Sequence, residues 1–217
     1  MTLIVDGTLA GLGVPKFVEL TAVRDITDLD NWNIKSAKNG KPTSPSQAWN
    51  LGDTKLTNLK AGQVIVIAGL DASLDILKLK YNTDQIFIAG EVMEVNGDDA
   101  IFLEYNGVIT DMYGNVGEDG TRTDWEYKDT YVCRKKYAVA SKTFVPDNWM
   151  INKVNLLDGV SDDEMMEELN NCKPPPLFLH IPVTESAKNA HDAVLAAITP
   201  TIKADIDAIV GGTLHYR

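Results

Sequence analysis

The chain has 217 residues, of which 44% are apolar, so it is long enough to bury a core as one large domain or two small ones. Its 20 Lys and Arg against 31 Asp and Glu give a net charge of −11, which argues against nucleic acid or an anionic membrane as the main partner. No apolar run reaches the ~18 residues that a transmembrane helix needs, and residues 1–13 lack the basic start of a signal peptide. We therefore expect synthesis in a cytoplasm.

Residues 1–58 read as an N-terminal arm followed by a loop. The short apolar run at residues 3–5 predicts a strand, and residues 25–58 lose any periodic pattern around closely spaced Gly, Pro and Ser. A terminal strand can dock on another subunit, or it can be an ordinary edge strand of its own domain. Large aromatics in a polar stretch cap a core or fill an interface pocket. The predicted docking residues are Leu3, Ile4, Val5, Phe17, Trp32 and Trp49.

Residues 59–145 predict a compact antiparallel β-domain. Short runs rich in Val, Ile, Leu and aromatics alternate there with Gly, Asn and Asp, as expected for strands joined by turns. The pairs Asn96-Gly97 and Asn106-Gly107 predict two tight hairpins, because such turns require positive φ. The expected strands are residues 63–68, 74–80, 86–95, 100–105, 108–112 and 130–140.

Residues 113–129 are rich in Gly and carboxylates and short of aliphatics, which predicts a long surface loop. Its acidic side chains could gather around a hard cation such as calcium. The EF-hand pattern fails, however, because Val116 stands at the turn-glycine position and Arg122 at that of the bidentate Glu. A solvated acidic loop is the favoured interpretation, and the basic cluster of residues 134–136 could face it or lie at a sheet edge.

Residues 146–217 change to helical signals. Ser161 and Glu164 have the spacing of a capping box, so a helix should begin at Ser161 and use Met165, Met166 and Leu169 as its apolar face. A further strand is expected at residues 177–183, followed either by two helices, through residues 184–198 and 200–210, or by one helix kinked at Pro200. Their narrow apolar stripe suits the parent domain or copies of itself. The predicted self-association residues are Val194, Ile198, Ile202, Ile206 and Ile209.

Few residues suggest a catalytic, cofactor-binding or metal-binding site. None of the motifs for a nucleophile elbow, a phosphate loop, a zinc protease or a dinucleotide site occurs, and the three histidines stand singly. Cys133 and Cys172 could form one disulfide, but buried, inert thiols are the safer interpretation. We therefore expect no enzyme, no cofactor and no metal.

The stretch from Leu59 to Met112 resembles small β-domains of tailed-phage virion proteins, such as capsid decoration and head-fibre proteins. The resemblance rests on a strand beginning with Gly-Gln-Val, followed by glycine-punctuated hairpins. The matching residues are Gly62, Gln63, Val64, Gly90, Val92, Gly97, Ile101, Phe102, Gly107 and Val108.

The chain should accordingly be mainly β with α additions, an antiparallel β-barrel or sandwich plus C-terminal helices. The resemblance implies a non-enzymatic component of a phage particle, such as a capsid decoration, head-fibre or neck/tail subunit. Such a protein would reside in the virion, dock on other virion proteins and form a homo-oligomer. The alternative is a soluble β-sheet module that binds carbohydrate or a protein ligand, with Trp125, Tyr127 and Tyr131 sharing one face as an aromatic platform.

Overall fold

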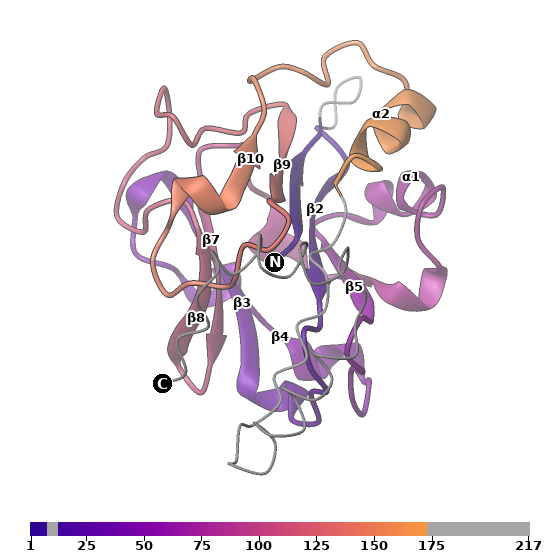
Figure 1. The fold of residues 1–217 in the computed structure, drawn as a ribbon, viewed down its shortest axis with the longest axis vertical. Coiled ribbons are helices and arrows are strands. Elements are labelled where there is room, and N and C mark those ends of the chain that lie inside the picture. The colour runs from indigo at the N-terminus through magenta and orange to yellow at the C-terminus, as the bar shows by residue number, and fades with distance from the viewer. Residues whose placement is uncertain (8–12, 173–217) are drawn as a thin grey trace, which may run out of the picture. The chain divides into compact units, whose positions relative to one another are not determined.

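The computed structural model describes residues 1–7 and 13–172, which belong to one compact unit (Figure 1). These residues form ten strands in two sheets. The larger sheet has the order β10-β9-β1-β2-β5-β6, and the smaller has the order β4-β3-β7-β8. The predicted strand at residues 177–183 and the self-association residues Val194, Ile198, Ile202, Ile206 and Ile209 lie outside the described residues.

The six-stranded sheet contains β1 (Leu3–Asp6), β2 (Lys16–Thr21), β5 (Val64–Ala68), β6 (Ile86–Ile88), β9 (Thr130–Arg134) and β10 (Trp149–Ile151). The four-stranded sheet contains β3 (Trp32–Ala37), β4 (Ala48–Asn50), β7 (Ala100–Tyr105) and β8 (Val108–Tyr113). Two α-helices accompany them, α1 (Leu74–Leu77) and α2 (Asp162–Leu169). Short 3-10 helices span Leu29–Asn31, Lys38–Gly40, Pro45–Gln47, Leu51–Thr54, Asp71–Ser73, Thr83–Gln85, Gly90–Met93 and Pro146–Asn148.

The six-stranded sheet is buried on both faces. Ile4 and Ile67 pack in one core with Ile34 and Ile101 of the smaller sheet. Leu3, Val5, Phe17 and Val66, which point the other way, pack in a second core with residues of α1 and α2. A strand buried on both faces carries a continuous apolar run rather than an alternating one. The prediction of a mainly β sandwich is therefore confirmed, with a helical layer on its outer face; the sheets do not close into a barrel.

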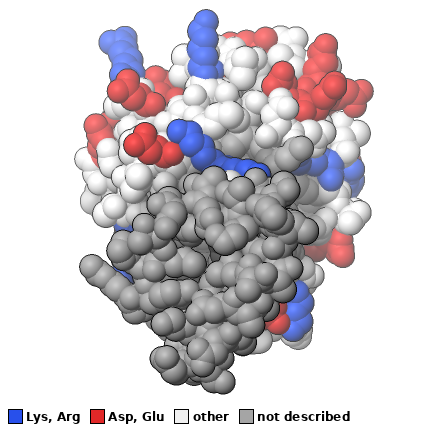
Figure 2. All heavy atoms as spheres, in the orientation of Figure 1, with Lys and Arg blue, Asp and Glu red and all other residues white. Residues whose placement is uncertain are grey.

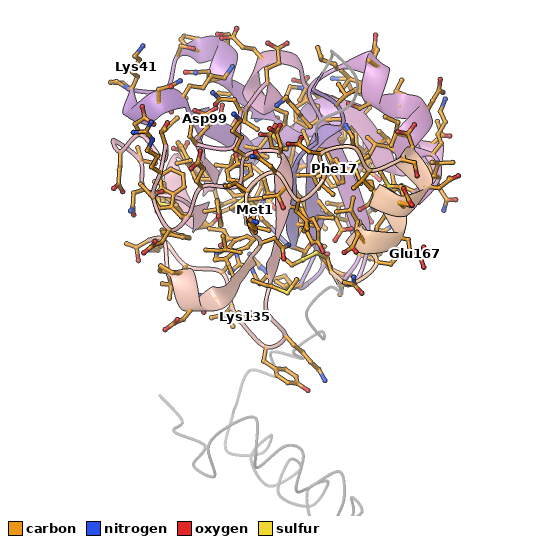
Figure 3. The ribbon with its side chains drawn as sticks, turned by 90° about the horizontal axis from the view of Figure 1, so that it is seen from above. Met1, Phe17, Lys41, Asp99, Lys135 and Glu167 are labelled. Carbon is orange, nitrogen blue, oxygen red and sulfur yellow. A yellow bond between two sulfur atoms is a disulfide. The ribbon has the colours of Figure 1, made fainter. Side chains whose placement is uncertain are left out.

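The N-terminal segment is not a projecting arm. β1 lies inside the large sheet, where it pairs with β2 (Leu3 opposite Glu19) and with β9 (Leu3 opposite Cys133). Met1 accordingly lies in the middle of the molecule in Figure 3. Leu3, Ile4, Val5 and Phe17 are completely buried, so their predicted role in docking is wrong. The alternative of an edge strand is also wrong, because both edges of β1 are paired.

The predicted boundaries at residues 58 and 145 are not seen. In both sheets, strands from the first 58 residues are hydrogen-bonded to later strands, and all described residues belong to one unit. The expected arm, β-domain and beginning of the C-terminal region therefore fold around shared cores.

Most of the predicted strands are confirmed, but residues 74–80 are not a strand. Val64–Ala68, Ala100–Tyr105, Val108–Tyr113 and Thr130–Arg134 form strands as expected. Ile76 and Leu77 are both buried in the same core, which a helix permits and a strand does not. The helix fits because β5 and β6 are parallel, and parallel strands require a crossover connection.

One of the two predicted hairpins is confirmed. β7 and β8 are antiparallel and are joined by Asn106 and Gly107, whose φ angles are 50° and 75°. The prediction of a hairpin at Asn96-Gly97 is wrong, because β6 pairs in parallel with β5 and not with β7. Gly97 does have a positive φ of 85°, but it belongs to a loop that packs against Lys128.

Candidate functional site

Trp32 and Trp49 are the two predicted docking residues whose side chains reach the surface, and both are half-buried. The Trp32 ring contacts Tyr105, with ring centroids 5.0 Å apart. Trp32 also lines an apolar cavity of about 140 Å³, whose wall includes Leu20, Leu59 and Leu103. This volume is close to that of a cavity known to hold benzene, so it could accept one apolar side chain.

A buried ion pair connects the two sheets at the wall of this cavity, which Met1 and Asp111 help to line. Nη2 of Arg134 on β9 lies 2.6 and 2.7 Å from the two carboxylate oxygens of Asp111 on β8. Arg134 Nε donates to the Met1 carbonyl at 2.8 Å, and the guanidinium lies 4.2 Å from the centre of the Trp149 ring. The Met1 ammonium lies 2.7 Å from Asp111, and burial lowers the pKa of this amino group. Every one of these groups is engaged, so the network serves to fasten β1, β8 and β9 together.

A second buried polar cluster lies where the loop after β6 meets residues 38–40. Asp99 is 1% exposed and accepts from the backbone N–H groups of Asn39 (2.8 Å) and Asn96 (3.2 Å). Asp98 accepts from the Thr121 hydroxyl at 2.9 Å. Burial, aided by the charge of Asp98, raises the pKa of Asp99 to about 6. Both carboxylates are thus bound by donors of their own chain and hold three loops in place.

The acidic segment at residues 113–129 is only partly the solvated loop that was predicted. Trp125 and Tyr127 are 4% and 0% exposed, and Tyr113 donates its hydroxyl to the Trp125 carbonyl at 2.7 Å. Tyr131 is also buried. The proposed aromatic platform of Trp125, Tyr127 and Tyr131 is therefore wrong, because these rings belong to the cores. Within residues 1–7 and 13–172, no three His, Cys, Asp or Glu side chains are placed to hold a metal ion.

Cys133 and Cys172 form a disulfide, so the expectation of two free thiols is wrong. Their Cα atoms are 5.5 Å apart, within the usual range for a disulfide, and both residues are buried. The bond connects β9 to the residues that follow α2. The two cysteines are 39 residues apart in the sequence, and nothing in that spacing indicates that they pair.

A groove runs along the outer face of α2. It has a volume of about 580 Å³ and is lined by Leu156, Gly159, Val160, Glu164, Glu167, Glu168 and Asn171. The helix begins as predicted, because the Ser161 hydroxyl accepts from the Glu164 N–H and the Glu164 carboxylate accepts from the Ser161 N–H. Figure 2 shows acidic side chains gathered at the upper right, where Figure 1 places α2. This groove was not foreseen, although the acidic residues at helical spacing were visible in the sequence.

Comparison with protein-family models gives no match for this chain, and comparison with curated proteins gives no similar sequence. In the part of the chain that the structure describes, no helix is long and apolar enough to cross a membrane.

Proposed function

We propose that the chain is a non-enzymatic structural component of a phage particle, such as a capsid decoration, head-fibre or neck/tail subunit. The observation that supports this most directly is a β-sandwich with a disulfide between its central sheet and its helical layer. Disulfides persist on virion surfaces and in other oxidising surroundings but are rare in the cytoplasm. The resemblance of residues 59–112 to phage virion domains points in the same direction through the β7–β8 hairpin, whereas the hairpin expected at Asn96-Gly97 does not support it.

The protein would act through the shape of a rigid module that binds other virion proteins. Its central strand is paired on both edges, so the sandwich can keep its form while surface side chains make the contacts. Trp32, with the adjacent cavity, is a suitable anchor site, because buried aromatic residues and the pockets beside them carry much of the energy of protein interfaces. The carbohydrate-binding alternative loses its specific support, since its aromatic platform is buried.

Density-gradient purification of particles, followed by quantitative mass spectrometry, tests the proposal. Peptides of this chain should co-purify with the particles in a fixed ratio to the major capsid protein. A Trp32→Ala variant should be incorporated less, whereas Val116→Ala, which alters an exposed side chain elsewhere, should be incorporated normally. The proposal is refuted if the chain is abundant in the lysate and missing from intact particles.

A further inference from the structure

The groove along α2 combines an apolar floor with carboxylates that lack basic partners. Leu156 in the floor is 41% exposed. Glu164, Glu167 and Glu168 lie three and four residues apart, so they share one face of the helix, where like charges repel. In the described part of the chain, none of the three forms a salt bridge with Lys or Arg. An occupant that carries positive charge and an apolar group would relieve both features.

The loop between β9 and β10 offers the complementary surface. The loop, residues 135–148, contains three basic residues, Lys135, Lys136 and Lys142, and one acidic residue, Asp147. Lys135 and Lys142 are exposed, and neither has an acidic partner among the described residues. Between them lies Val139, which is 63% exposed, more than any other large apolar side chain in the part of the chain that the structure describes. The loop thus presents an apolar side chain between two positive charges.

The disulfide fixes both surfaces to one part of the fold. Cys133 stands two residues before Lys135, and Cys172 follows the groove residue Asn171. Figure 3 shows Lys135 and Glu167 on the side of the molecule away from Lys41. The loop and the groove therefore both adjoin the same disulfide-linked part of the fold.

We propose that copies of this chain bind one another by placing the β9–β10 loop of one copy in the α2 groove of the next. Val139 then contacts Leu156, and Lys135 and Lys142 lie beside Glu167 and its neighbours. An apolar centre with a charged rim is the usual composition of a protein interface. The inference rests on the proposed function for its biological meaning, because an assembly subunit must associate, but it concerns the purified chain alone.

Charge exchange on the purified full-length chain tests this contact. Lys135→Glu and Glu167→Lys each replace an attraction by a repulsion, so each should weaken self-association about tenfold, as should high salt. Mixing the two variants in equal amounts should restore association, because the acidic loop of one meets the basic groove of the other. Lys41→Glu and Glu91→Lys are matched controls at exposed positions elsewhere and should leave association unchanged.

Sedimentation velocity over a wide concentration range supplies the measurement, with circular dichroism to confirm that every variant folds. A native chain that stays monomeric throughout overturns the inference. So does association that neither variant weakens, or a loss that mixing does not restore. A failure of this test leaves incorporation into particles untouched, and the absence of the chain from particles would leave this contact intact, so the two proposals fail separately.

Discussion

Removing the disulfide should lower the free energy of unfolding by about 4 kcal/mol. The bond closes a loop with a sequence separation of 39 residues. In the chain-entropy treatment, cross-linking a loop of that length costs the unfolded state about 13 cal/mol/K, which is about 4 kcal/mol at 25 °C. Cys133 and Cys172 are both buried against the helical layer, so their replacement by Ala also removes a small amount of packing.

The assay is equilibrium denaturation followed by tryptophan fluorescence, on the native chain, on the native chain with reductant and on a Cys133→Ala/Cys172→Ala variant. Reduction changes no side-chain volume and therefore serves as the control for packing. Both treatments should shift the midpoint to lower denaturant. In hydrogen exchange, α2 should lose protection first, because the apolar contacts of Met165, Met166 and Leu169 and hydrogen bonds from Tyr131 and Lys80 then hold it without a covalent link.

The reasoning is refuted if reduction changes the free energy of unfolding by less than about 1 kcal/mol, well below the range that loop closure predicts. It is also refuted if the denatured, unreduced chain contains two titratable thiols. In the second case the disulfide does not form, and the support it gives to a role outside the reducing cytoplasm is lost as well.

Three further predictions concern buried groups and turns. Arg134→Met should destabilise the fold by about 3 kcal/mol in denaturant titration, because it leaves the Asp111 carboxylate buried without the Arg134 guanidinium. A double-mutant cycle with Asp111→Asn should show strong coupling between the two residues. Because burial raises the pKa of Asp99 from 3.8 to about 6, the folded state binds a proton there that the unfolded state does not, so the contribution of Asp99 to stability should rise as pH falls from 7 to 4. This gain, about 2 kcal/mol, should be missing in Asp99→Asn when the two proteins are titrated with denaturant at both pH values. Gly107→Ala should lower the free energy of unfolding by about 1 kcal/mol, because it adds only backbone strain. Gly97→Ala should lower it by about 3 kcal/mol, because the added Cβ would also meet the backbone of Lys128. Thermal unfolding measures both values, and equal losses would contradict the packing of this loop.

The features that sequence reasoning predicted well are local ones. Ser161 and Glu164 stand three residues apart and cap α2 reciprocally, and Asn106 with Gly107 makes the β7–β8 turn. In both cases the required backbone conformation is satisfied by side chains within one turn of chain. No long-range contact is needed, so the pattern alone was sufficient.

The features that were missed depend on contacts between distant residues. Arg134 belongs to a basic run that reads as a surface cluster, yet its side chain is 4% exposed and bonded to Asp111, 23 residues away. Cys133 and Cys172 could not be paired without the position of α2 on the sheet. Trp125 and Tyr127 likewise follow a carboxylate-rich stretch but fold back into the core. Burial of such groups is decided by tertiary partners that spacing does not reveal.

Because β1 is a buried strand inside the large sheet and not an arm, its residues cannot form a docking surface. Leu3, Ile4 and Val5 form an uninterrupted apolar run, which suits either an arm that inserts into a partner or a strand buried on both faces. The pairing of β1 with both β2 and β9 shows the second, so removing this segment would unfold the sandwich rather than free it from a partner. In the proposed roles, contacts with other proteins involve half-buried aromatics such as Trp32 and charged surfaces such as the α2 groove. A deletion of the first residues is for that reason an unsuitable test of assembly, and point changes at these surfaces are required.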